Sequence, residues 1–193
     1  FHGYFTANLP IREHNDLTSE TAETHSMSME FFTEPWMELF FGERAEDYRE
    51  MHFEDTLMFI PYGTMVDEFQ NIVYKHPEMT PEERNELWKK LEKEYRPHLD
   101  YKDNHFLNEG RLWQKQSHIY ENPYYYIDYC LAAVNALQYK VFMKRDFKEA
   151  WKSYMEFSHL SASLFFTELE KKAGLMSPFE EGSIRKLVEG LED

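Results

Sequence analysis

The segment TSETAETHSMSMEFF, residues 18–32, combines the signals of a helix start with those of a buried helix. Thr18 or Ser19 can cap the helix N-terminus, and an acidic Glu20 in the first turn suits the helix dipole. A helix with apolar groups nearly all round is typically buried, and the apolar side chains here are Met27, Met29, Phe31 and Phe32. The segment therefore predicts a helix that takes carboxylates toward a core.

The rest of the chain favours an all-α fold, because glycine is scarce (7 residues) and no alternating strand pattern is sustained. Thr80, Pro81 and Glu83 form the pattern of a capping box with proline at the first helical position, which predicts a helix over 81–95. Residues 1–17 and 97–110 are expected to be irregular. The other predicted helices cover 45–76, which Pro61 and Gly63 should kink or split, and then about 110–117, 124–144, 146–158, 160–173 and 179–191.

Composition narrows the class of protein. A chain of 193 residues with 42% hydrophobic residues can form one domain with its own core. No run of about 18 apolar residues is present, so we expect no membrane-spanning helix. A net charge of -15 would repel nucleic acids and anionic lipids. We therefore expect neither nucleic acid nor membrane as a partner.

The N-terminus and the single cysteine suggest a cytoplasmic location. The first residues, FHGYFTANLP, lack the basic and apolar regions of a signal peptide and lack an initiator methionine, so we expect a processed or partial sequence. One cysteine, Cys130, excludes an internal disulfide and fits a reducing compartment. Because it lies in the apolar run YCLAAV, we expect it to be a small core residue and not a nucleophile.

Carboxylates recur on one side of the predicted helix at 18–33. Glu23, Met27 and Glu30 are spaced i, i+4, i+7 and share a face, and Glu20 lies one turn before Glu23. One interpretation is a solvated acidic stripe. The other follows from the surrounding apolar residues, because a buried carboxylate must be paired, hydrogen-bonded or bound to a metal.

A second cluster lies in QKQSHIYENPYYYIDYC, residues 114–130. His118 precedes a run of tyrosines, and several phenols with an imidazole could stabilise an oxyanion. The competing interpretation is aromatic core packing, which we expect for most of them. The tyrosines are Tyr120, Tyr124, Tyr125, Tyr126 and Tyr129.

A third pattern is the E-x-x-H pair Glu156 and His159, the unit from which carboxylate-bridged di-metal bundles are built. Such a bundle needs two pairs and two further glutamates, for which Glu23 and Glu30 are candidates, but only one pair occurs. The chain contains no H-E-x-x-H, no Cys-x-x-Cys, no G-x-S-x-G and no glycine-rich phosphate loop.

Several separate motifs occur in an order that resembles the C-terminal half of oligoendopeptidase F, in the thimet-oligopeptidase-like family of zinc metallopeptidases. The resemblance covers essentially the whole chain and rests on FHGYF, SETAETHSMSMEFF, LMFIPYGTMVDEFQNIVY, HPEMTPEER and QSHIYENPYYYIDYCLA. It implies a mostly helical cytoplasmic peptidase that cuts short peptides in a deep channel. Residues 1–193 would be the C-terminal part of one catalytic domain.

The resemblance also implies a partial zinc site. The family places H-E-x-x-H on one helix and a glutamate on a second helix, and the second histidine would lie two residues before Phe1. Glu23 would then be the third protein ligand, and Glu30 would hydrogen-bond into the site. His25 would be a neighbouring or lining residue, and His2 would lie just beyond the histidine pair.

The same resemblance assigns oxyanion stabilisation to His118 with Tyr125 or Tyr126. Two zinc ligands and the general base would come from an upstream portion of the peptidase, which is therefore an expected partner beside short peptides. The isolated chain is expected to be inactive. The alternative is a helical module that binds peptides in a tyrosine-rich groove without cutting them.

Overall fold

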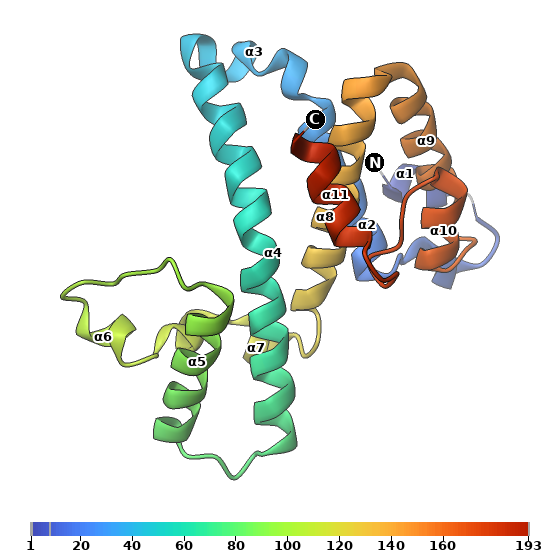
Figure 1. The fold of residues 1–193 in the computed structure, drawn as a ribbon. Coiled ribbons are helices and arrows are strands. Elements are labelled where there is room, and N and C mark those ends of the chain that lie inside the picture. The colour runs from blue at the N-terminus through green and yellow to red at the C-terminus, as the bar shows by residue number, and fades with distance from the viewer. Residues whose placement is uncertain (1, 8, 193) are drawn as a thin grey trace. The chain divides into compact units, whose positions relative to one another are not determined.

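The computed structural model describes residues 2–7 and 9–192, and every regular element within them is a helix (Figure 1). This confirms the predicted all-α fold. The chain divides into two compact units, residues 1–53 with 131–193 and residues 54–130, and each is described by itself. Phe1 and the side chain of His2, for which the sequence predicted a place beside a histidine pair, lie outside the described part.

None of the described helices has the length and apolar character needed to cross a membrane.

The first unit contains the helix predicted from residues 18–32, observed as α2 (Ser19–Phe32). It also includes the start of α4 (Ala45–Lys75) and most of α8 (Tyr126–Arg145). Its remaining helices are α1 (His2–Thr6), α3 (Glu38–Phe41), α9 (Phe147–Leu160), α10 (Phe166–Ala173) and α11 (Ser183–Glu192), with short 3-10 turns at Arg12–Asn15, Glu34–Trp36 and Gly42–Arg44.

Aromatic side chains from three helices form the core of the first unit. Phe32 at the end of α2 contacts Tyr139 of α8 and Tyr154 of α9, with ring centroids 5.6 and 5.1 Å apart. Tyr139 and Tyr154 pack edge to face at 5.8 Å. Such pairs contribute about 0.5–1.5 kcal/mol each beyond their buried area. The apolar end of α2 is therefore anchored in a core, as the sequence predicted.

An ion pair joins α8 to the turn after α2. Lys140 donates to both carboxylate oxygens of Glu34 at 2.7 Å, and the two side chains are only 17% and 16% exposed. The ammonium group also lies 4.9 Å from the ring centre of Phe31 and 5.3 Å from that of Phe53. These contacts fix the chain directly after the acidic face of α2.

The second unit is built around residues 54–75 of α4, with a core that includes Met65, Phe69, Trp88, Trp113 and Ile119. The indole of Trp113 donates to the Asn85 side chain at 2.9 Å, which ties a short turn to α5. Its other elements are α5 (Pro81–Tyr95), α6 (His105–Asn108), a 3-10 turn at Leu112–Lys115 and α7 (His118–Glu121), followed by the first residues of α8.

The capping box at the start of α5 is confirmed. The Glu83 amide donates to the Thr80 hydroxyl at 3.2 Å, and the Thr80 amide donates to the Glu83 carboxylate at 2.8 Å. Both ends of the predicted range, 81 and 95, agree with the structure. Reciprocal capping satisfies two backbone donors that the helix itself cannot satisfy.

The predicted split of the long helix is wrong, because α4 runs from Ala45 to Lys75 through Pro61 and Gly63 without interruption, and the kink stays a prediction. Gly63 has a packing role instead. A side chain there would begin 2.2 Å from the sulfur of Cys130, so only glycine lets α8 approach α4 this closely. Cys130 is 3% exposed, and burial raises the pKa of its thiol to about 12, as suits a core residue.

Other helix boundaries differ where tight turns replace regular helix. The predicted helix over 110–117 is only a 3-10 turn, because Gly110 has a positive φ of 74° and approaches the Asn85 carbonyl closely. Helix α10 begins at Phe166, six residues later than predicted. One-turn helices α1 and α6 lie within segments that were expected to be irregular.

Candidate functional site

The first candidate region is the face of α2 that bears Glu23 and Glu30, two helical turns apart. Glu23 is partly buried, and the Ser26 hydroxyl lies 3.2 Å from one of its carboxylate oxygens. The opposite side of the helix is closed by buried Thr21, Thr24 and Ser28. The helix therefore has one packed polar side and one side on which carboxylates are accessible.

Glu30 has a partner that lies far from it in the sequence. Its carboxylate oxygen is 2.7 Å from Nε2 of His52 on α4, and the side chains are 52% and 13% exposed, respectively. The imidazole is therefore a fixed group that holds a more accessible carboxylate.

His52 packs against two aromatic rings. Its ring lies 4.7 Å from that of Phe31 and nearly parallel to Tyr48 at 5.6 Å. Tyr48 in turn stacks on Phe41 at 4.2 Å. Burial, followed by the nearby charges of Glu30 and Glu34, raises the pKa of the Tyr48 phenol. The stack restricts the orientation of the imidazole that faces Glu30.

His25 lies on another side of α2 from Glu23. It is 2% exposed, and its ring approaches Tyr154 and Phe157 of α9 at 6.1 and 5.7 Å. The Tyr154 hydroxyl donates to the His25 backbone carbonyl at 3.0 Å. The structure therefore places His25 against the aromatic core of the first unit, and its role beside a metal stays a prediction.

The second candidate region surrounds His118, at the start of α7 in the second unit. The Tyr62 hydroxyl donates to the amide oxygen of Gln116 at 2.8 Å, which leaves the amide nitrogen to donate to Nδ1 of His118 at 2.7 Å. A neutral imidazole that accepts at Nδ1 carries its proton on Nε2. This chain of hydrogen bonds thus prepares Nε2–H of His118 as a donor.

The structure brings the predicted tyrosines together with His118. Tyr125 is partly buried and lies nearly parallel to the imidazole, with ring centroids 6.1 Å apart. Tyr126 packs edge-on at 4.9 Å, is 8% exposed, and burial raises the pKa of its phenol. Tyr129 is a third neighbour, 5.8 Å from His118. Tyr125 is thus the more accessible of the two predicted donors.

The donor groups in the described part of the chain determine which metal sites it can form. Among the described side chains of residues 3–7 and 9–192, no three His, Cys, Asp or Glu are grouped so that they could hold a metal ion. Catalytic zinc takes three protein ligands and an open position. A partly buried carboxylate such as Glu23 fits one of those ligand positions. The described donors therefore fit a share of a zinc site and not a complete one.

The E-x-x-H pair does not belong to a cluster of metal-binding side chains among the described residues. Glu156 and His159 are both exposed on α9, and Nδ1 of His159 lies 2.6 Å from the Met155 carbonyl within the same helix. The di-metal hypothesis gains no support from the described residues.

Two partners of the candidate residues were not predicted from the sequence. His52 follows Glu30 by 22 residues in no known motif, so nothing local signals the pair. Gln116 stands two residues before His118, close enough in the sequence for its amide to reach the imidazole. This short spacing is a signal from which the contact could have been predicted. The predicted residues Glu23, His25 and Glu30 belong to the first unit, and His118, Tyr125 and Tyr126 belong to the second.

Comparison with solved structures finds strong matches over 99% of the chain. A structure described as an oligoendopeptidase F is 49% identical with a TM-score of 0.95, and a Pz peptidase A with an inhibitor is 47% identical with a TM-score of 0.94. A structure described as an oligoendopeptidase F from Bacillus anthracis strain Ames is 40% identical, with a TM-score of 0.83. No protein-family model and no curated protein matches.

The chain covers 34%, 34% and 31% of those three structures, respectively. It therefore spans about a third of their length, less than the half suggested by the sequence motifs.

Proposed function

Because the chain belongs to the oligoendopeptidase F family of peptidases, we propose that it is part of a zinc-dependent endopeptidase that hydrolyses short, unstructured peptides. The observation that carries this proposal is the identity of 49% and the TM-score of 0.95 over 99% of the chain. Since the chain spans a third of its relatives, activity belongs to the full-length protein. The 193 residues alone are expected to be inactive.

Glu23 is proposed as one zinc ligand, and the other two would be histidines supplied from outside this chain. Zinc, when bound, lowers the pKa of a coordinated water toward 7 and so supplies a nucleophile at neutral pH. Glu30 would accept a hydrogen bond from a neighbouring ligand, and His52 would hold the Glu30 carboxylate in position through the 2.7 Å contact. Groups that orient metal ligands in this way commonly affect metal affinity.

His118 is proposed to donate from Nε2 to the oxygen that becomes negative when a peptide carbonyl is attacked. The hydrogen bond from Gln116 to Nδ1 supports this role, because it favours the tautomer with a proton on Nε2. Tyr125, partly buried and parallel to the imidazole, is the preferred phenol donor. The burial of Tyr126 supports a packing role for that residue.

The proposal extends to partners and location. Short peptides and the upstream portion of the peptidase are the proposed partners. A single cysteine, buried with a raised thiol pKa, is compatible with the proposed cytoplasmic location, where disulfides are rare.

Peptide hydrolysis by the full-length protein tests this function. Cleavage of an internally quenched peptide should stop when a chelator removes zinc and should return when zinc is added back. Glu23→Gln should remove nearly all cleavage, whereas Glu20→Gln, one turn earlier on the same helix, should retain it. Full cleavage in the presence of the chelator, or in the Glu23→Gln variant, would refute the proposal.

A helical module that binds peptides without cutting them is the second candidate. It is favoured by the observation that the described residues contain only part of a zinc donor set. The same assay separates the two candidates, because the module would bind the quenched peptide with unchanged fluorescence and would not respond to zinc.

A further inference from the structure

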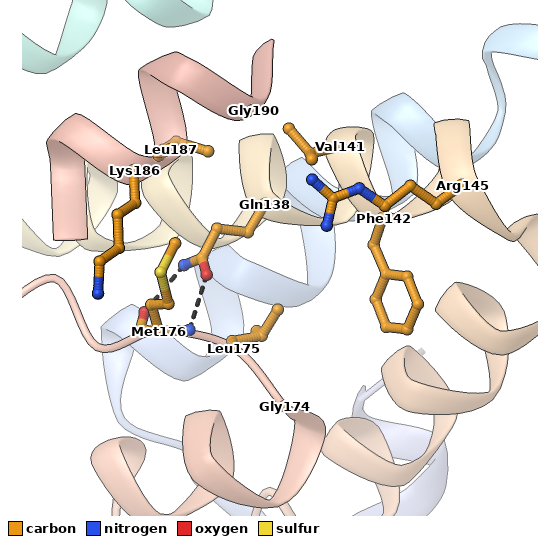
Figure 2. A pocket seen from close by; sticks show the side chains of 10 residues that line it. All are labelled: Gln138, Val141, Phe142, Arg145, Gly174, Leu175, Met176, Lys186, Leu187 and Gly190. Carbon is orange, nitrogen blue, oxygen red and sulfur yellow. Dashed lines mark hydrogen bonds between the residues drawn. The ribbon is translucent and has the colours of Figure 1, made fainter. Parts of the chain in front are cut away.

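A pocket of about 400 Å³ lies in the first unit between α8, α11 and the segment that follows α10 (Figure 2). It contains none of the residues assigned to the proposed peptidase site. Its size falls within the range of small-molecule sites, roughly 300–1,000 Å³. The described residues that line it are Gln138, Val141, Phe142, Arg145, Gly174, Leu175, Met176, Lys186, Leu187 and Gly190.

Apolar side chains line part of the pocket, and α8 and α11 pack closely beside it. Leu175 and Leu187 are 8% and 4% exposed. A side chain at Gly190 would begin 3.2 Å from Val141, so glycine allows α11 to lie close against α8 at this edge. The ammonium group of Lys144 donates to the Leu191 carbonyl at 3.2 Å, which ties the end of α11 to α8. The two helices therefore form fixed sides.

Gln138 fixes the third side. Its amide nitrogen donates to the Met176 carbonyl at 2.9 Å, and its amide oxygen accepts from the Met176 amide at 2.7 Å (Figure 2). This two-point contact holds the segment after α10 in place. Gly174, with a left-handed φ of 73°, ends α10 and turns the chain into that position. A preformed pocket loses less entropy when a ligand binds.

The charges at the pocket have one sign. Arg145 from α8 and Lys186 from α11 are both exposed at its edge, and the guanidinium group of Arg145 reaches toward the other lining residues in Figure 2. No acidic residue is among the described residues that line it. Neither cation forms an ion pair with another described side chain, although the chain carries 36 acidic residues and a net charge of -15.

The helix dipole explains why a cation is favourable at only one of these two positions. Arg145 lies in the last turn of α8, where a positive charge favours the helix end. Lys186 lies in the first turn of α11, where the helix dipole disfavours a positive charge. Two cations from different helices beside apolar side chains can therefore bind an anion that also carries an apolar group.

We propose that this pocket binds a small monocarboxylate with an apolar body. The carboxylate would interact with Arg145 and Lys186, and the apolar body would lie against Val141, Leu175 and Leu187. An ammonium group on the ligand would find no lining carboxylate, so an acid whose other end is uncharged fits best. The proposal does not depend on the peptidase function, because the pocket shares no residue with that site.

Binding of N-acetyl-phenylalanine to the full-length protein, measured by calorimetry, tests this site. The matched probe is N-acetyl-phenylalaninamide, which has the same apolar body without the charge. The acid should bind about tenfold more tightly than the amide, because hydrogen bonds between charged groups are stronger than those between neutral groups. Its affinity should also fall as ionic strength rises, since the two cations are exposed.

Variants assign the effect to the pocket. Arg145→Gln and Lys186→Gln should each weaken binding of the acid about fivefold or more and leave binding of the amide nearly unchanged. Arg185→Gln, which removes an exposed cation from α11 outside the pocket lining, is the control and should leave both affinities unchanged. All three variants alter exposed side chains, so the fold should persist.

Three results would overturn the proposal. The first is equal affinity for the acid and the amide. The second is an Arg185→Gln variant that loses as much affinity as the two pocket variants. The third is inorganic phosphate binding as tightly as N-acetyl-phenylalanine, which would show that the apolar wall contributes nothing.

Discussion

The acidic face of α2 and the cluster around His118 differ in where their partners come from. Glu30 is held by His52, which lies 22 residues away, and the neighbouring Glu34 is held by Lys140, which lies 106 residues away. His118 is held by Gln116, two residues before it, and by tyrosines within the next eleven residues. A local cluster can be recognised in a sequence, whereas distant partners emerge only from the fold.

The two regions also differ in what holds them. The α2 region depends on contacts between carboxylates and basic groups, so charge and protonation should affect it most. The His118 region depends on ring packing and one amide, so shape should affect it most. Variants that remove charge in one unit and alter packing in the other can separate these two modes.

The largest expected effect is on catalysis in the His118 region. His118→Ala in the full-length protein should lower kcat about 100- to 1,000-fold with little change in KM, because it removes a donor needed in the transition state. Steady-state kinetics with a quenched peptide measures both constants. Tyr120→Phe, at a residue that is 57% exposed, is the control and should be near wild type. A His118→Ala variant with normal kcat would exclude the oxyanion role.

A pH-dependent effect on stability is expected next, at Glu170 of α10. This carboxyl is fully buried, and burial raises its pKa to about 7, with smaller opposing contributions from Ser177 and Asn135 and reinforcing ones from Glu180 and Glu20. A raised carboxyl pKa stabilises the fold below pH 4.5, and that contribution is lost as the pH rises through about 7. Glu170→Gln should therefore stabilise the protein above pH 7 by about 3 kcal/mol and leave it unchanged at acid pH.

Thermal unfolding of the Glu170→Gln variant across pH measures this effect. Glu189→Gln, at an exposed carboxylate of α11, provides the baseline for loss of one negative charge. A Glu170→Gln variant whose midpoint shifts equally at acid and alkaline pH would show that the carboxyl does not titrate as described.

A smaller effect is expected from packing in the second unit. Gly63→Ala should destabilise the protein by about 2 kcal/mol, because the new carbon would overlap the Cys130 sulfur. Cys130→Ala removes that sulfur, so the double variant should recover most of the loss. Denaturant unfolding of the two single variants and the double variant measures the coupling. Additive effects of the two changes would mean that the close approach of α8 to α4 is not the cause.

The smallest expected effect is on zinc affinity, through His52. His52→Ala should weaken zinc binding by the full-length protein about tenfold, because Glu30 loses the group that orients it. Competition with a fluorescent chelator measures this affinity, and His52→Gln, which keeps a hydrogen-bond donor, should recover part of it. His76→Ala, on an exposed histidine just after α4, should leave the affinity unchanged. A zinc affinity equal to that of the wild type in all three variants would show that His52 does not support the zinc site.

The predictable parts of this molecule are those encoded by neighbouring residues. The capping box of Thr80 and Glu83 predicted the start of α5, and the apolar end of 18–32 predicted the burial of Phe31 and Phe32 in α2. Pro61 and Gly63 were misread as signals that split the helix, because the role of Gly63 is to make room for Cys130, which lies far away in the sequence.

The candidate site shows the same limit. His118 and its tyrosines form one run of sequence, and their grouping was expected. The contact of His52 with Glu30 and the cationic pocket between α8 and α11 join distant segments, and neither leaves a local pattern. Tyr125 and Tyr126 could not be ranked from the sequence, because adjacent residues of the same type differ only in the burial that the fold gives them.

The zinc content of the full-length protein tests the central claim most directly. Elemental analysis after exhaustive dialysis should find one zinc ion per wild-type and per Glu20→Gln molecule, and far less than one per Glu23→Gln molecule. Circular dichroism should show the same helical content for all three proteins. Stoichiometric zinc in a folded Glu23→Gln variant would contradict the assignment of Glu23 as a ligand.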